Sequence, residues 1–207
     1  MLVMPARRCQ QRGFNLFELM VTVVVLALVL SQLMPYVGDW LQNLKVRNAA
    51  ESLRGGMERA RMEALKRNTT VTFWLVADTT SAVPGASCTL SSTSSAWVVS
   101  VANPAGSCDT LPSLTDALQL VARSVAQENS SAVTVSAQSS SAAAANHVSF
   151  NGLGQVLLDV SAPIQTVDLR QATGSGRRMR VVVEAGGSVR SCDPDVVAGD
   201  PRVCPTL

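Results

Sequence analysis

Histidine, aromatic residues and charge are all scarce in this sequence. Its 207 residues include one histidine, four phenylalanines, three tryptophans and one tyrosine, and only 15% are charged. A single histidine excludes sites built on several imidazoles, and the formal net charge of +2 excludes a nucleic-acid binder that relies on bulk positive charge. A hydrophobic fraction of 47% excludes a wholly disordered chain. No nucleophile–base pair or ligand cluster stands out, so we expect no enzymatic activity, no cofactor and no bound metal.

Charge is missing altogether from residues 19–38, where apolar side chains dominate. A helix of about 20 residues spans about 30 Å, the thickness of a bilayer's hydrocarbon core. Residues 1–13 contain Arg7, Arg8 and Arg12 and no acid, and such basic flanks hold an N-terminus in the cytoplasm. We therefore predict a transmembrane helix over 14–38, with the rest of the chain outside the cytoplasm. A buried core helix and a cleaved secretory signal are the alternatives.

A small residue, Gly13, precedes the predicted span 14–38, and an acid, Glu18, lies just inside that span. An ionisable group at such a depth usually has a partner, and cleavage after Gly13 would supply the amino group of Phe14. The stretch resembles the prepilin processing motif of type IV pilins and type II secretion pseudopilins, with matches at Gly13, Phe14, Leu16 and Glu18. The resemblance implies removal of the leader 1–13 by a prepilin peptidase and N-methylation of Phe14. It also implies that Glu18 pairs with the Phe14 amine of a neighbouring subunit during assembly.

The helical pattern continues beyond residue 38 but becomes amphipathic. Apolar residues recur at spacings of three and four as far as Leu65, with charges of both signs between them. Pairs such as Glu63 and Arg67 have helical spacing, and we expect a solvated, charged face. The pattern predicts one helix from Phe17 to about Arg67, ending at Asn68, whose second half is the segment 39–67.

Short runs of β-branched and aromatic residues follow the helix, separated by turns. Asn151–Gly154 is typical of a hairpin turn. Two stretches rich in Ser, Ala and Thr, 79–95 and 128–146, have little to bury, and we expect mobile loops there. Strands after one long helix predict an α+β fold, with an antiparallel sheet or sandwich packed on the helix's second half. The predicted strands are 71–77, 97–102, 118–124, 132–136, 147–150, 155–160, 166–170, 178–184 and 188–192.

A more specific resemblance extends over most of the chain. Residues 49–68, the stretch 148–156 and the tail segments 187–192 and 199–204 resemble the GspH/FimT branch of the pilin superfamily. This implies a type IV pilin-like fold in which 68–207 forms a β-rich globular domain. It implies a structural subunit that assembles with other pilins or pseudopilins on an inner-membrane platform. The expected location is the bacterial inner membrane, with the globular domain in the periplasm, and then a filament.

Two roles within this branch stay open. One is a GspH-like minor pseudopilin near the tip of a type II secretion pseudopilus, which serves protein secretion across the outer membrane. The alternative is a FimT-like minor pilin of a type IV pilus that binds DNA in natural transformation.

Five cysteines become four if the leader, which contains Cys9, is removed. An even number in an exported domain favours disulfides. The favoured pairs, Cys88–Cys108 and Cys192–Cys204, each close a local loop, and a bridge of this kind contributes about 3 kcal/mol. A four-cysteine zinc site is the alternative, although it lacks C-x-x-C spacing and needs reduced thiols.

Positive charge is sparse in the domain until its C-terminal segment. Residues 68–169 contain one base, Arg123, against six acids, whereas 170–207 contain six arginines against four acids. A local cationic patch can contact DNA phosphates, and in DNA-binding FimT-like pilins a Gly-Arg-x-Arg element has this role. The aligned element here is Gly187–Arg190, without the first arginine; a solvated edge strand protected by charge is the alternative. The candidate DNA contacts are Arg177, Arg178, Arg180 and Arg190.

Overall fold

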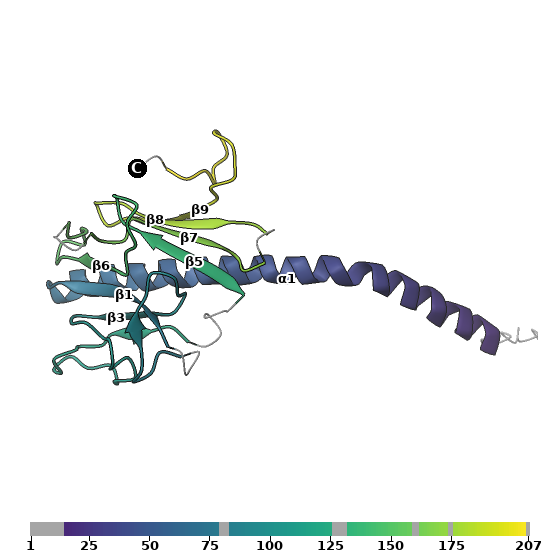
Figure 1. Cartoon of the computed structure of the whole chain (residues 1–207), viewed down its shortest axis with the longest axis horizontal. Coiled ribbons are helices and arrows are strands. Elements are labelled where there is room, and N and C mark those ends of the chain that lie inside the picture. Colours follow the sequence, from purple (N-terminus) through teal and green to yellow (C-terminus); the bar gives the residue numbers. More distant parts are fainter. Residues whose placement is uncertain (1–14, 79–82, 126–131, 159–161, 174–175, 206–207) are drawn as a thin grey trace, which may run out of the picture. The chain divides into compact units, whose positions relative to one another are not determined.

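The computed structural model of the chain describes residues 15–78, 83–125, 132–158, 162–173 and 176–205, without the side chains of 32–37 and 39. The chain divides into two compact units, one ending at Trp40 and the other beginning at Leu41. A single helix, α1 (Leu16–Arg67), belongs to both (Figure 1). The predicted helix therefore forms, starting one residue earlier than expected.

Helix α1 ends at a residue in the left-handed conformation. Asn68 has a φ of 50°, and asparagine tolerates this region better than most non-glycine residues. The amide of Thr69 donates to the carbonyl of Ala64 at 3.3 Å, which caps a free carbonyl of the last turn. The predicted stop at Asn68 is confirmed.

The first sheet is built around β1 (Val71–Ala77) and is antiparallel throughout. β3 (Trp97–Ser100) pairs with β1, and β4 (Ala122–Arg123) pairs with β3. β6 (His147–Phe150) and β2 (Thr89–Leu90) pair with successive stretches of β1.

The second sheet has four antiparallel strands in the order β5-β7-β8-β9. β5 alternates buried and exposed residues along its length, the pattern of a strand with one face on a core. The strands are β5 (Val133–Gln138), β7 (Thr166–Gln171), β8 (Met179–Val183) and β9 (Val189–Cys192).

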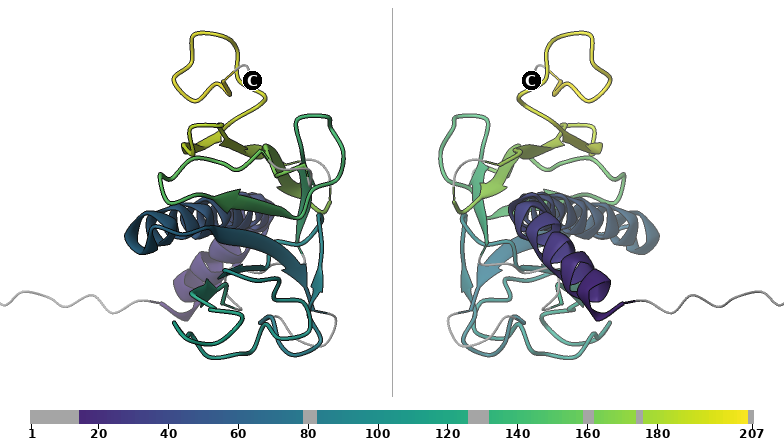
Figure 2. Two further views of the ribbon diagram at one scale, coloured as in Figure 1. Left: turned by 90° about the vertical axis from the view of Figure 1, so that its left-hand side faces the viewer. Right: turned by 90° about the vertical axis from the view of Figure 1, so that its right-hand side faces the viewer.

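Both sheets and the second half of α1 share one hydrophobic core. Figure 1 and Figure 2 show β7, β8 and β9 of the second sheet above this half of the helix and β1 and β3 of the first sheet below it. The helix contributes side chains at spacings of three and four, so they form one buried stripe. The predicted α+β architecture, a helix packed on antiparallel sheets, is confirmed. The buried helix residues are Val46, Ala49, Ala50, Leu53, Met57, Ala60 and Ala64.

A smaller core lies on the other face of the first sheet. Phe73 and Leu75 of β1 belong to the main core, whereas Val76 and the partly buried Trp74 belong to the smaller one. This smaller core includes the Cys88–Cys108 disulfide. We call the segments that build it, residues 83–96 and 101–121, the outer lobe.

The four cysteines that the structure describes form the disulfides Cys88–Cys108 and Cys192–Cys204, the local pairing that the sequence favours. Within the described part of the chain, no group of three or more His, Cys, Asp or Glu residues is arranged to hold a metal ion.

Removal of the first bridge is expected to destabilise the domain more than removal of the second. Cys88–Cys108 closes the longer loop, 20 residues against 12, and both of its cysteines are buried in the smaller core. Replacing both by alanine should lower the free energy of unfolding by about 2–3 kcal/mol. Urea unfolding followed by tryptophan fluorescence measures this, with the Cys192/Cys204→Ala variant as control. A larger loss in the control would contradict the expectation.

The predicted strand over 155–160 is wrong where the structure describes it. Val156 forms only an isolated bridge to Phe150, and its amide donates to the carbonyl of Ala185 at 3.1 Å. Hydrogen bonds from Leu157 to Ser149 and from Asn151 to Gln155 pair this backbone with β6 for only a few residues, and its other edge contacts the β8–β9 connection.

Two further predictions fail for local reasons. The strand predicted over 118–124 shrinks to β4, because Gln119 has a φ of 44° and interrupts the extended backbone. The Ser-, Ala- and Thr-rich stretches are not loops throughout, since they contain β2 and β5. The strand predicted over 132–136 is confirmed as β5, in which Val133, Val135 and Ala137 alternate with polar residues and face the core.

Two glycine-containing turns meet the end of α1. The Nε of Arg61 donates to the carbonyl of Gly154 at 2.9 Å, and a Cβ on Gly152 would lie 2.9 Å from a backbone carbon of Asn68. Gly154 and Gly187 have φ values of 74° and 82°. We call these five residues, Arg61, Asn68, Gly152, Gly154 and Gly187, the turn junction, because they join the helix end, the turn after β6 and the β8–β9 turn.

Candidate functional site

The predicted processing site lies outside the described residues. Cleavage after Gly13 and methylation of Phe14 therefore stay predictions. Glu18 lies in the first turn of α1 and is exposed. A carboxylate in a first turn interacts favourably with the positive end of the helix dipole. Because Glu18 is exposed, its carboxylate is accessible to a cation from outside the chain.

The first part of α1 exposes apolar side chains on every side; we call residues 16–31 the apolar arm. The exposed fractions of its large apolar residues run from 46% at Val21 to 77% at Leu16. The hydroxyls of Thr22 and Ser31 donate to carbonyls three residues earlier, both at 2.8 Å, so these polar groups are satisfied within the helix. Glu18 is the one charged residue of the arm. Such a surface needs an apolar cover.

Among the residues described above, none of the helical stretches is both long and apolar enough to cross a membrane. The span predicted over 14–38 stays a prediction, since it includes Phe14 and the side chains of 32–37.

Each of the four candidate DNA-binding arginines is paired with a carboxylate. Arg180 makes two hydrogen bonds to Asp168, at 2.7 and 3.0 Å. The hydrogen bond from Arg178 holds the pKa of Asp195 below its ordinary value. The patch predicted from the arginine count is therefore largely neutralised. The four pairs are Arg177–Asp193, Arg178–Asp195, Arg180–Asp168 and Arg190–Glu184.

A fifth pair lies in the loop closed by the second disulfide. Hydrogen bonds from the side chain and backbone of Arg202 lower the pKa of Asp200 to about 2. This carboxylate stays ionised throughout the range in which most proteins work, so the arginine beside it offers no free charge to a phosphate.

The sequence predicts a solvated, charged face on the second half of α1, but part of that face borders a pocket. Arg59, Glu63 and Arg67 face Leu114 and Val121 of the loop that precedes β4. Helical spacing shows that the three charged residues share one face. The opposing loop lies some 50 residues further along the chain (the Arg67–Gln119 hydrogen bond spans 52), and no local sequence signal joins the two.

Comparisons with known proteins give a weak structural likeness and no curated relative. A sequence comparison with curated proteins finds no match. Two crystal structures of the type IV minor pilin FimU from Pseudomonas aeruginosa (strain PAO1) are similar, at 14% identity and TM-scores of 0.43 and 0.45. The likeness covers 70% and 73% of this chain and 90% of each FimU chain. At these values it carries no argument about function.

A family match covers more than half of the chain. Residues 49–187 match the family described as type II transport protein GspH. The matched region begins in the buried stripe of α1, includes both sheets as far as the β8–β9 turn, and ends at Gly187 of the turn junction. The chain therefore belongs to the GspH family and is a minor pilin or pseudopilin, a structural subunit of a type II secretion system or a type IV pilus.

Proposed function

We propose that this protein is a GspH-like minor pseudopilin, built into a type II secretion pseudopilus near its tip and serving protein secretion across the outer membrane. The apolar arm is the observation that carries the proposal, because its large apolar side chains are exposed and a surface of this kind needs an apolar cover. In a filament, the arms of neighbouring subunits cover one another. The position near the tip rests on the resemblance to the GspH branch alone.

Glu18 fits a role in assembly. Burial of a lone carboxylate among apolar helices is unfavourable unless a cation pairs with it. A prepilin peptidase that cuts between Gly13 and Phe14 creates such a cation, the amine of Phe14, and methylation keeps its charge. We propose that Glu18 binds this amine on the neighbouring subunit and so fixes the register of the packed arms.

Before assembly, we propose that the inner membrane covers the arm while the domain that begins at Leu41 lies in the periplasm. The basic residues at the N-terminal end favour this orientation. An assembly platform in that membrane would then transfer the subunit into the filament.

Variants of the arm and the leader test the proposal in the bacterium that encodes the protein. Gly13→Leu is expected to keep the unprocessed mass and to be absent from sheared filaments. Glu18→Gln should be processed but should enter filaments at least tenfold less often than wild type. Val197→Asp, at an exposed position of the C-terminal loop, is the matched control and should behave as wild type. An unprocessed wild-type protein, or one never found with filaments, would sink the proposal.

Deletion of the gene separates secretion from the pilus role. Loss of secreted proteins from the culture supernatant, with pilus-dependent motility and DNA uptake intact, is the expected result. The opposite pattern would assign the protein to a type IV pilus.

We do not extend the proposal to DNA, because the candidate arginines are paired with carboxylates. The purified chain in detergent micelles is expected to give no salt-sensitive shift of a 30-base-pair duplex at micromolar concentration. Replacing the four arginines by alanine should change nothing in this assay. A shift by the wild type that weakens steeply with salt and disappears in the variant would restore the DNA-binding role.

A further inference from the structure

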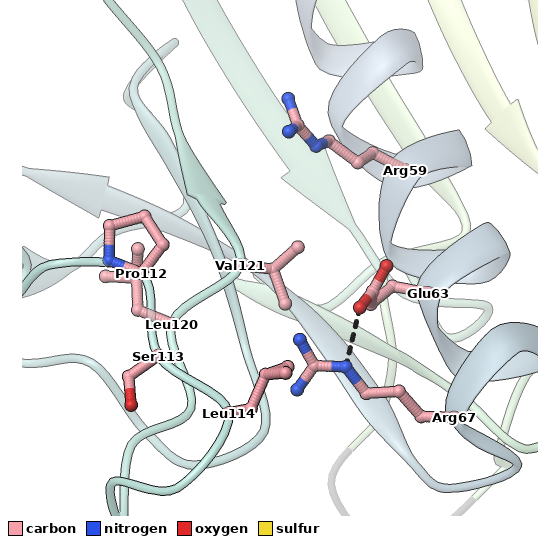
Figure 3. A pocket seen from close by; sticks show the side chains of 8 residues that line it. All are labelled: Arg59, Glu63, Arg67, Pro112, Ser113, Leu114, Leu120 and Val121. Atoms are coloured by element: carbon pink, nitrogen blue, oxygen red, sulfur yellow. Dashed lines mark hydrogen bonds and ion pairs between the residues drawn. The ribbon is translucent and has the colours of Figure 1, made fainter.

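A pocket of about 300 Å³ opens between the last turns of α1 and the outer lobe (Figure 3). Arg59, Glu63 and Arg67 line its helical side at a spacing of four residues. The loop before β4 supplies the other side, and Figure 3 shows Leu114 and Val121 facing the helix there. The pocket thus combines guanidinium groups with an aliphatic wall.

The wall is held in place before any ligand arrives. The Nε of Arg67 lies 2.6 Å from a carboxylate oxygen of Glu63, and its Nη1 donates to the side-chain oxygen of Gln119 at 3.3 Å. The side chains of Arg67 and Glu63 are only 14% and 16% exposed. This chain of contacts fastens the loop to the helix, so binding needs little ordering of the site.

Arg59 is the cation of the pocket that forms no ion pair among the described residues. Arg59 is exposed, and no carboxylate lies within ion-pair distance of it among the residues that the structure describes. Glu63, by contrast, is already engaged by Arg67 and by Lys66. A guanidinium presents a planar fork of donors that matches a carboxylate, so Arg59 is suited to an acidic side chain from outside.

Exposed leucines stand in the loop that forms the pocket wall. Leu114 is 68% exposed and Leu111 is 78% exposed. Large aliphatic side chains left open beside a charged pocket are typical of a protein-binding surface. They favour a ligand with an aliphatic side chain next to its carboxylate.

We propose that this pocket docks a segment of another filament subunit in which an aspartate or glutamate stands beside an aliphatic residue. The carboxylate binds Arg59, and the aliphatic side chain packs on Leu114 and Val121. The volume suits one or two side chains. The inference rests on the proposed function, because the partner is taken to be another subunit of the same filament.

Fluorescence anisotropy of labelled peptides tests the pocket on the full chain in detergent micelles. The probe is a peptide with the sequence Gly-Glu-Leu-Leu-Glu-Gly, and its control carries glutamine in place of both glutamates. We expect the acidic peptide to bind and the control to bind at least tenfold more weakly. Arg59→Glu and Leu114→Asp should each weaken the acidic peptide at least tenfold. Arg47→Glu is the matched control, because it makes the same charge change at an exposed position of the same helix, and it should stay within twofold of wild type.

Two results would overturn the inference: no binding of the acidic peptide at millimolar concentration, or equal weakening by Arg47→Glu and Arg59→Glu. Incorporation into filaments separates its failure from that of the proposed function. If only the inference fails, Arg59→Glu enters filaments as wild type does. If the proposed function fails, the wild type is absent from filaments even though the acidic peptide binds at Arg59.

Discussion

Replacing Gly187 by alanine is expected to lower the free energy of unfolding by about 4 kcal/mol, which leaves little of a marginal stability. Gly187 has a φ of 82°, and a side chain in this region is strained by about 1–3 kcal/mol. A Cβ there would also overlap the carbonyl oxygen of Gly154. That oxygen cannot move freely, since it accepts the hydrogen bond from Arg61 at 2.9 Å, so overpacking adds about 1–3 kcal/mol.

The neighbouring glycine is the matched control. Gly186 is exposed, does not have a positive φ, and a Cβ added to it would meet no atom within 4 Å. Gly186→Ala should therefore change the free energy of unfolding by no more than about 0.5 kcal/mol. Urea unfolding of both variants in detergent micelles, followed by tryptophan fluorescence, measures the difference. Equal effects of the two substitutions would show that the turn junction does not tie the β8–β9 turn to α1.

Local pattern was sufficient for the elements that depend on local physics. The stripe from Val46 to Ala64 follows the helical period, and Asn68 is a residue that accepts the left-handed conformation of a helix end. β1 is rich in β-branched and aromatic residues, and it is buried on both faces. These features need no knowledge of distant partners.

Features that depend on distant partners were missed or misjudged. The amide of Val156, on the edge of the short hairpin that faces away from β6, donates to the carbonyl of Ala185, and nothing in the local pattern indicates that partner. The arginine count treats residues 170–207 as a basic segment, but Asp168, just outside that window, is opposite Arg180 in the β7–β8 register. Charge counted along the chain is therefore a poor measure of charge on a folded sheet, where the register decides which groups meet.

The adjacent glycines Gly55 and Gly56 of α1 also show that distant contacts decide what the local pattern cannot. Replacement of each by alanine is expected to change the free energy of unfolding in opposite directions. Glycine in a helix is less stable than alanine by about 1 kcal/mol, so sequence alone predicts that Gly55→Ala and Gly56→Ala both stabilise. The structure separates them. Gly55 is exposed with nothing within 4 Å, whereas Gly56 is buried and its Cβ would lie 2.8 Å from Phe73 and 2.9 Å from Trp97.

Neither ring near Gly56 can withdraw easily. The Trp97 indole donates to the hydroxyl of Ser52 at 2.9 Å, and its ring packs 5.9 Å from that of Phe73. An added methyl group therefore overpacks the contact between α1 and the first sheet, which destabilises by about 1–3 kcal/mol and outweighs the gain in helix propensity. We expect Gly55→Ala to raise the free energy of unfolding by about 1 kcal/mol and Gly56→Ala to lower it by about 2 kcal/mol. Urea unfolding of the two variants gives both values, and stabilisation by Gly56→Ala would mean that the helix and the sheet are less tightly packed than these distances require.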